Sequence, residues 1–414
     1  MKKYKLNECT DILAGGTPST KNEKYWNGNI PWLSVKDFGN VNKIVSETEK
    51  TITLEGFNNC PSNMLHKGDL ILSARGTVGK IAMVDKDMAF NQSCFGIRTK
   101  NNICNSDFIF YWYLNNQKIF KGAQQGNVFK SVTLDFFEKT EANLPSLEIQ
   151  QKIAAVLSSL DDKIALNNRM NAKLEQMAKR LYDYWFVQFD FPVPCHSELV
   201  SESHNKEMLN QVQHDERIKP YKSSGGKMVW NEELKREIPA GWEVKKLGEI
   251  ALVKRGTTIT EKDTTKGNVK VVAGGLDFSY YHNQSNRKAN CITVSGSGEN
   301  AGFVNFWREP IFASDCSTVQ CENDIDTMLC YFALKMQEKR FYRISHKSAQ
   351  PHIYPKDVAE IPIVVPNEAV KSKISDFFLK SNWKIALIEK ETQKLTALRD
   401  RLLPLLMNGQ VEVN

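Results

Sequence analysis

The sequence lacks the paired cysteines that build zinc sites. Its nine cysteines are scattered singly along 414 residues, and the closest two are Cys316 and Cys321. Dispersed, odd-numbered thiols are typical of a reducing cytosol, so we expect a cytoplasmic protein without a zinc site. No run of about 18 or more apolar residues occurs that could span a membrane. Polar residues follow the N-terminal Met-Lys-Lys-Tyr-Lys, which argues against a signal peptide.

Catalytic signatures are missing as well. An adenine methyltransferase needs Asn-Pro-Pro-aromatic and a Gly-rich nucleotide loop, and neither residues 29–32 nor residues 296–302 have these patterns. A P-loop needs Gly-x-x-x-x-Gly-Lys-Ser/Thr, whereas residues 76–81 have the wrong spacing and no hydroxyl after the lysine. Glu-x-Lys occurs at Glu233 and Glu243, without the upstream Pro-Asp of a nuclease. We therefore expect a non-catalytic chain that binds no cofactor or metal itself.

Size and charge leave room for a large, polyanionic partner. A chain of 414 residues is too long for one small core, so two domains with connecting helices are expected. Lys and Arg number 55 against 48 Asp and Glu, a formal net charge of +7. A mildly basic balance permits binding to nucleic acid without requiring it.

Two helical patterns repeat each other at a distance of 221 residues. From residue 149 apolar side chains recur at alternating spacings of three and four, as at Ile153, Ile164 and Met177, and the second copy has Ile374, Ile385 and Leu398 in their places. Both copies contain Lys-Ile-Ala-Leu, at residues 163–166 and 384–387. The spacing predicts two long helices with a heptad seam, which Asn167 interrupts once. An internal repeat of this quality predicts a tandem organisation of the whole chain.

The segments between the helices repeat more loosely. Residues 5–17 are matched by 246–257, residues 71–76 by 292–298, and residues 89–93 by 311–315. We therefore predict an α+β protein in which two mixed α/β globular domains are separated by two long helices that pair as an antiparallel coiled coil, a pseudo-two-fold tandem repeat. The expected segments are a first domain at 1–144, a helix at 145–190, a linker at 191–240 with a polar insertion at 195–217, a second domain at 241–365 and a helix at 366–414.

The pattern of divergence indicates DNA recognition. The helices kept their identities, whereas the domains kept their framework turns and changed their loops, as expected of two related domains with different targets. A helix of about 35–40 residues spans roughly 50–60 Å, more than the 34–36 Å or so of one duplex turn, so two half-sites could be bound at once.

Two motifs add a family resemblance. Residues 144–153 read Leu-Pro-Ser-Leu-Glu-Ile-Gln-Gln-Lys-Ile, and residues 221–242 contain Lys-Ser-Ser-Gly-Gly-Lys-Met and Ile-Pro-x-Gly-Trp. They look like the Pro-x-x-x-x-Gln-x-x-Ile helix start and the central region of the specificity subunits of type I restriction-modification systems. The resemblance covers nearly the whole chain outside 195–217. The C-terminal copy departs from the helix-start pattern at Lys371.

The resemblance implies that residues 1–144 and 241–365 are target-recognition domains, each recognising one half of a bipartite double-stranded DNA sequence. It further implies that the paired helices set the gap between the half-sites and bind two methyltransferase (M) subunits. Restriction (R) subunits would join through the complex, and S-adenosylmethionine, ATP and magnesium would belong to these partners. The departure at Lys371 implies docking at that end that is less tight or uses different contacts.

Polar turns at matching places in the two domains supply the candidate DNA contacts. Arg75, in the loop at 73–80, can form two hydrogen bonds to guanine, and Lys80 suits a phosphate. The matching loop at 295–302 has no cation, but Asn300 suits adenine. The predicted DNA-binding residues are Thr17, Ser19, Lys21, Ser73, Arg75, Thr77, Lys80, Asn91, Gln92, Lys254, Arg255, Thr257, Ser297, Asn300, Arg343 and Lys347.

Each candidate also has a plain structural interpretation. The two loops could be solvated hairpins, the turns at 15–21 and 254–262 surface turns, and Asn91 and Gln92 framework hydrogen-bonding residues. The whole chain could instead be a coiled-coil adaptor with two protein-binding domains. Salt-sensitive binding to duplex DNA would favour recognition of DNA, and binding indifferent to salt would favour the adaptor.

Overall fold

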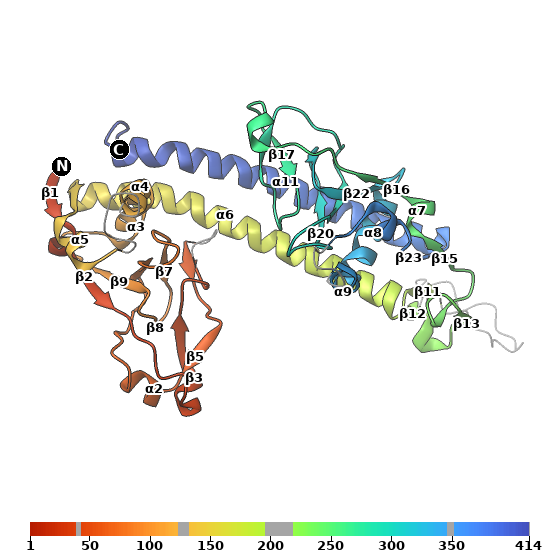
Figure 1. The fold of residues 1–414 in the computed structure, drawn as a ribbon, viewed down its shortest axis with the longest axis horizontal. Coiled ribbons are helices and arrows are strands. Elements are labelled where there is room, and N and C mark those ends of the chain that lie inside the picture. The colour runs from red at the N-terminus through yellow and green to blue at the C-terminus, as the bar shows by residue number, and fades with distance from the viewer. Residues whose placement is uncertain (39–42, 123–131, 195–217, 346–351, 414) are drawn as a thin grey trace, which may run out of the picture. The chain divides into compact units, whose positions relative to one another are not determined.

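The computed structural model describes residues 1–38, 43–122, 132–194, 218–345 and 352–413. The predicted insertion at 195–217 lies outside this description. The chain forms two compact units, one of residues 1–169 together with 390–414 and one of residues 170–389. Each unit contains a globular domain and part of both long helices, α6 (Leu147–Tyr182) and α11 (Glu368–Met407), which Figure 1 labels.

The first unit contains two main sheets and one separate strand pair. The sheets have the orders β2-β9-β6-β7-β4 and β5-β3-β8, and β1 pairs with β10. β6 and β7 are antiparallel, and every residue of both is buried, as expected for short continuous apolar runs. The bounds are β1 Lys2–Lys5, β2 Thr10–Ala14, β3 Trp26–Leu33, β4 Ile44–Val45, β5 Lys50–Ile52, β6 Leu70–Ser73, β7 Ile81–Val84, β8 Ala89–Phe90, β9 Cys94–Thr99 and β10 Glu141–Leu144.

The second unit repeats this topology. Its sheets have the orders β16-β22-β19-β20 and β18-β17-β21, and β15 pairs with β23. β17 pairs with β21 in parallel, as β3 does with β8. The bounds are β15 Glu243–Lys246, β16 Leu252–Arg255, β17 Val269–Val272, β18 Tyr280–His282, β19 Cys291–Ser295, β20 Val304–Trp307, β21 Phe312–Ala313, β22 Cys316–Gln320 and β23 Pro362–Val365. The predicted tandem repeat of mixed α/β domains is therefore confirmed.

Short helices occupy matching places too. In each domain an asparagine caps the helix that follows the large sheet: the side chain of Asn105 accepts a hydrogen bond from the backbone of Phe108, and Asn323 does the same for Asp326. α3 is rich in aromatic side chains, and Phe108 to Tyr113 are all buried. The bounds are α1 Leu6–Cys9, α2 Leu54–Asn58, α3 Ser106–Asn115, α4 Gln117–Gly122, α5 Leu134–Lys139, α7 Leu247–Ile250, α8 Asp324–Met336, α9 Glu338–Ser345 and α10 Pro355–Ala359.

Within the first unit α6 and α11 pack against each other in opposite directions. Asp161 of α6 contacts Arg399 of α11, and Asn167, further along α6, contacts the earlier Thr392. The predicted antiparallel pairing is present here, and supercoiling stays a prediction. The predicted seam drifts in the second unit, where Met177 is 52% exposed and Ala178 is buried instead. A straight helix with 3.6 residues per turn rotates about 20° per heptad, which accounts for this displacement.

An aromatic cluster in the second unit lies where α6 ends. A single π turn, Asp183–Val187, follows the helix and buries Trp185 and Phe186. Two small hairpins follow, formed by β11 (Pro192–Pro194) with β12 (Ile218–Pro220) and by β13 (Met228–Asn231) with β14 (Arg236–Pro239). Trp242 packs on Phe186, Phe189 and Phe191, with ring centroids 5.1–5.6 Å apart. The segment predicted as a linker is thus folded where it is described.

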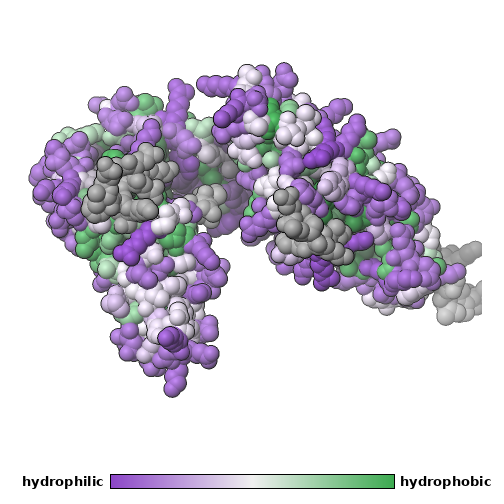
Figure 2. Space-filling model, in the orientation of Figure 1, coloured by the Kyte–Doolittle hydropathy of each residue, from purple (hydrophilic) through white to green (hydrophobic). Residues whose placement is uncertain are grey.

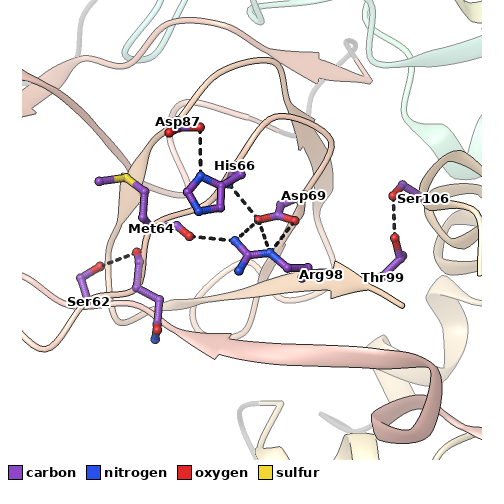
Figure 3. Close-up of polar contacts among 9 residues, drawn as sticks. Ser62, Met64, His66, Asp69, Asp87, Arg98, Thr99 and Ser106 are labelled. Carbon is purple, nitrogen blue, oxygen red and sulfur yellow. Dashed lines mark hydrogen bonds and ion pairs between the residues drawn. The ribbon is translucent and has the colours of Figure 1, made fainter. Parts of the chain in front are cut away.

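Two buried polar contacts fix the first domain. The Asp69 carboxylate accepts hydrogen bonds from Arg98 and from the backbone of His66, and Figure 3 shows it between these two groups. The side-chain oxygen of Gln150, at the start of α6, accepts a hydrogen bond from the backbone N–H of Asn105 at 3.0 Å. Its amide donates to the carbonyls of Ile103 and Pro145, both at 3.0 Å. Gln150 therefore attaches the long helix to the domain that precedes it.

The described segments contain no helix long and apolar enough to cross a membrane. In the same segments no group of three or more His, Cys, Asp and Glu side chains is placed to hold a metal ion.

Candidate nucleic-acid interface

The loop between β6 and β7 has a buried base and an exposed tip. Ser73 is fully buried, and its hydroxyl donates to the carbonyl of Thr77 and accepts from the backbone N–H of Lys80 at 2.8 Å. Ser73 therefore shapes the loop rather than facing DNA, which corrects the prediction. The tip is glycine-dependent, since Gly76 has a φ of 74°. Arg75 and Thr77 are exposed on this tip, and Lys80 is half-buried.

Backbone hydrogen bonds hold the loop against the turn that follows β8. The N–H groups of Ala74 and Arg75 both donate to the carbonyl of Ser93, at 2.8 and 3.2 Å. The side-chain oxygen of Asn91 accepts from the N–H of Ser93 at 3.1 Å, so Asn91 has a framework role in this turn. The Arg75 side chain thus projects from a backbone that is already held in place. The loop backbone therefore loses less conformational entropy when a ligand binds.

The polar turn after β2 reaches the same place. Thr17 is hydrogen-bonded to Gln92, and the N–H of Gly16 donates to the carbonyl of Phe90 at 2.9 Å. Ser19 and Lys21 are exposed beyond this contact. Three predicted segments, the turn at 15–21, the loop at 73–80 and the turn at 91–93, therefore converge at one end of the first domain's sheets.

A cleft of about 510 Å³ opens between the loop at 73–80, the turn at 91–93 and the end of β3. Arg75, Thr77 and Asn91 line it from the predicted segments. Trp32, Lys36 and Lys50 line it from β3, the loop after it and β5, and sequence reasoning did not single them out. Figure 2 shows mostly hydrophilic and intermediate residues over the β3–β5 end of this domain.

Asp37 and Glu49 are the acidic residues that line the cleft. The Asp37 carboxylate accepts hydrogen bonds from the backbone and hydroxyl of Ser34, both at 2.7 Å, and from the backbone of Glu49 at 2.8 Å. Asp37 is therefore satisfied within the domain, whereas Arg75, Lys36 and Lys50 contribute three cations to the lining. A cleft with more cations than free carboxylates suits a phosphate backbone.

The same three segments converge in the second domain with different chemistry. Asp315, in the turn after β21, is hydrogen-bonded to the Ser297 hydroxyl and lies 3.7 Å from the Arg255 guanidinium. The N–H of Thr257 donates to the carbonyl of Ala313 at 2.9 Å. Lys254, Arg255 and Thr257 are exposed. Here the cation comes from the end of β16, not from the loop between β19 and β20.

The remaining predicted residues lie elsewhere or are half-buried. Asn300 is half-buried, and its carbonyl accepts the backbone N–H of Phe303 at 3.0 Å. Arg343 is exposed on α9, a different element from the converging turns. Lys347 lies outside the described residues.

Comparison with known proteins gives a consistent result. The family model of the type I restriction modification DNA specificity domain matches residues 1–176 and 239–397. The MjaIX type I restriction enzyme specificity subunit of Methanocaldococcus jannaschii is 26% identical over 99% of this chain and 93% of its own length. The HindI specificity subunit of Haemophilus influenzae is 24% identical over 84% of this chain and 87% of its own.

A solved structure shares the fold. The crystal structure of a type I restriction-modification S subunit from M. genitalium superposes with a TM-score of 0.58 at 17% sequence identity, covering 98% of this chain and 95% of the other.

Proposed function

Since the chain belongs to the type I restriction-modification DNA specificity family, whose domain model matches it twice, we propose that its two domains each recognise one half of a bipartite DNA target. In this proposal the chain performs no chemistry. It directs two methyltransferase subunits, and through the assembled complex the restriction subunits, to the site. The complex would act on double-stranded DNA in the cytoplasm, and the cofactors would be bound by the partner subunits.

The observation that supports this function most directly is the repeated convergence of three polar turns. Both domains bring together the turn after the first strand of the large sheet, the loop between two buried strands and the turn after a short parallel strand. The backbone contacts correspond, because the N–H groups of Arg75 and Gly296 donate to the carbonyls of Ser93 and Asp315. The side-chain contacts differ, since Thr17 is hydrogen-bonded to Gln92 in the first domain and Ser297 to Asp315 in the second. Two sites with one framework and different hydrogen-bonding groups suit two half-sites with different bases.

The first domain's chemistry favours a guanine contact. Arg75 lies on an exposed, anchored tip in a cleft that also contains Lys36 and Lys50. A guanidinium can donate two hydrogen bonds to guanine O6 and N7 in the major groove, and flanking lysines suit phosphates. In the second domain Arg255 shares Asp315 with Ser297, so the exposed groups include both donors and acceptors. Such a set suits a base edge that presents both kinds of group.

The long helices would bind the methyltransferase subunits. Of the two helix starts, the first uses Gln150 for three hydrogen bonds to the domain, and the second has Lys371 at the corresponding place. Lys371 forms ion pairs with Asp326 at 3.2 Å and Glu368 at 2.7 Å. Both starts thus attach a helix to a globular domain, through different contacts, which supports a shared role for the two helices.

Exchange of one domain tests the function. Residues 1–144 are replaced by the corresponding domain of another specificity subunit, and the methylated motif is determined in cells that also contain the methyltransferase. One half of the motif should change while the other half and the gap between them remain. A matched exchange of residues 241–365 should change only the other half. A change in both halves after either exchange would contradict the assignment, and salt-insensitive binding of the unmodified complex would favour the adaptor.

A further inference from the structure

A buried carboxylate joins the long helices and the domain in the first unit. Asp161 of α6 is 9% exposed. Its Oδ1 accepts a hydrogen bond from Nη1 of Arg399 in α11 at 2.8 Å, and its Oδ2 accepts one from the Tyr111 hydroxyl of α3 at 2.6 Å. Burial, together with the neighbouring carboxylate, raises the pKa of Tyr111, so the phenol remains a donor. One side chain thus connects three elements.

A buried amide makes a second connection between the same helices. Asn167, six residues further along α6, is 1% exposed. Its Nδ2 donates to Oε2 of Glu391 at 2.9 Å and to the Thr392 hydroxyl at 3.3 Å, both on α11. The Lys163 ammonium lies 3.5 Å from the other oxygen of Glu391.

The second unit has an equivalent connection of opposite charge. Arg308, directly after β20, has 8% of its side chain exposed. It donates to Glu175 of α6 at 3.1 Å, and to Glu389 and Asn382 of α11, both at 2.9 Å. In each unit, therefore, one buried charged side chain joins the domain, α6 and α11.

Polar groups of this kind distinguish between helix registers. An apolar heptad seam is nearly degenerate, because sliding one helix by seven residues places apolar side chains opposite apolar side chains again. In the observed register Asp161 faces Arg399. A slip by seven residues in one direction would place Leu406 there, leaving a buried carboxylate without its cation, which is strongly unfavourable. The opposite slip would move Asn167 from Thr392 to Ile385.

A further polar residue at the seam supports a role in specificity rather than in stability. Asn171 follows Asn167 by one turn, and its amide oxygen is buried without a hydrogen-bond partner among the described residues. An unsatisfied buried oxygen is destabilising. Polar residues at a helix seam are known to specify register at a cost in stability.

We propose that Asp161, Asn167 and Arg308 are positioning residues that select one axial register of α6 against α11. A slip of one heptad moves one helix about 10 Å along the other. If the proposed function holds, on which this consequence rests, that slip would change the gap between half-sites by about three base pairs, at about 3.4 Å each.

A variant without these polar groups tests the proposal. It combines Asp161→Leu, Arg399→Leu, Tyr111→Phe, Asn167→Leu, Arg308→Met and Glu389→Leu in the full chain, so that Glu389 is not left without its cation. Apolar replacement of whole buried ion pairs is often neutral or stabilising. A variant that keeps its melting temperature but changes its helix register therefore shows that the polar groups select the register and are not needed for stability. Nitroxide labels are introduced through a ketone-bearing amino acid at Ala155 and Lys390, both exposed and both in the first unit, and their separation is measured by pulsed electron paramagnetic resonance.

The unchanged chain should give one distance, and the apolar variant should add a population displaced by about 10 Å along the helix axis. Restoring Asn167 alone, or Arg308 together with Glu389, should reduce the displaced population without abolishing it. The exposed neighbour Asp162 provides the control, since Asp162→Leu should leave the distribution unchanged. A single native distance in the folded apolar variant would overturn the proposal.

If the full apolar variant does not fold, a series of variants with fewer substitutions replaces it. Chains that lack one or two of the three contacts retain the others, and the displaced population should grow with each contact removed. An unchanged distribution in every variant that folds would also overturn the proposal. The methylated motif is determined separately for each variant. A displaced population with an unchanged gap between half-sites would refute the spacing role of the helices and leave the register proposal standing.

Discussion

Gln150 offers the sharpest test of how a recognition domain is attached to its helix. We expect Gln150→Leu, which preserves the approximate size of the side chain, to destabilise the attachment. Its neighbour Gln151 is exposed on the same helix, so Gln151→Leu is a matched control. Only Gln150 is buried, with 1% of its surface exposed.

The magnitude follows from three hydrogen bonds. Gln150→Leu leaves the Asn105 N–H and the carbonyls of Ile103 and Pro145 without this partner. An unsatisfied buried donor or acceptor costs about 1–3 kcal/mol, and carbonyls lose less because they have two lone pairs. We therefore expect a loss of about 3 kcal/mol in the free energy of local opening, with little change in Gln151→Leu.

Hydrogen exchange at the Asn105 amide measures this quantity directly. Global unfolding is a poor readout because a chain with two compact units need not unfold in one step. A loss of about 3 kcal/mol corresponds to a decrease of roughly a hundredfold in the protection of this amide. Equal protection of Asn105 in Gln150→Leu and Gln151→Leu would refute the assigned role.

Three other substitutions probe the first and second domains. Arg75→Ala should lower DNA affinity about 10- to 100-fold, and only through contacts with the first half-site. Competition between DNA duplexes that are altered in one half of the target measures this effect. Lys86 is an exposed cation outside the cleft lining, so the control Lys86→Ala should not discriminate between the two halves. Asp69→Ala should lower the free energy of opening of the first unit by about 2–4 kcal/mol, measured by hydrogen exchange at the amides of β6 and β7. The loss is smaller than for a fully buried pair, because the arginine partner Arg98 has 36% of its side chain exposed. Asp87 pairs with His66 at the surface, so the control Asp87→Ala should lower the stability of the first unit by about 0.5 kcal/mol or less. An equal loss of stability in Asp87→Ala and Asp69→Ala would contradict this difference. Gly256→Ala should cost about 1–3 kcal/mol, because its Cβ would lie 2.0 Å from the carbonyl oxygen of Ser314, and an unchanged melting temperature would show that the turn does not need this close approach.

The elements that the sequence predicted best are those with local signals. The repeated heptads gave both long helices, and the apolar runs around residues 73–80 gave the β6–β7 hairpin. Sheet order was not predictable in this way, because β3 pairs in parallel with β8 across more than fifty residues of chain. That pairing brings Trp32 and Lys36 to the cleft, and no pattern near either residue indicates it.

The segments of the candidate site were chosen from the sequence, and their contact with DNA stays a prediction. Three turns were selected in each domain, and they converge. Ser73 was misassigned, because a hydroxyl at the end of an apolar strand can face the core or the solvent with the same sequence pattern. In the folded loop the Ser73 hydroxyl donates to the carbonyl of Thr77, and this contact turns the side chain inward. The sequence pattern does not reveal this contact. Met177 was placed at the seam by a strict heptad, which a helix of 3.6 residues per turn does not keep.

The division of the chain into units has a consequence for synthesis. Residues 170–389 form the second unit without interruption, whereas the first unit needs residues 390–414 as well as 1–169. Leu406 and Met407, from the very end of α11, are buried in the same core as Leu6, Ile153 and Leu157. A nascent chain therefore cannot complete its first unit until residues 390–414 have left the ribosome, by which time residues 170–389 are already available to fold. Until then the first unit remains incomplete, with the apolar surface that the end of α11 covers still open to chaperones or to premature association.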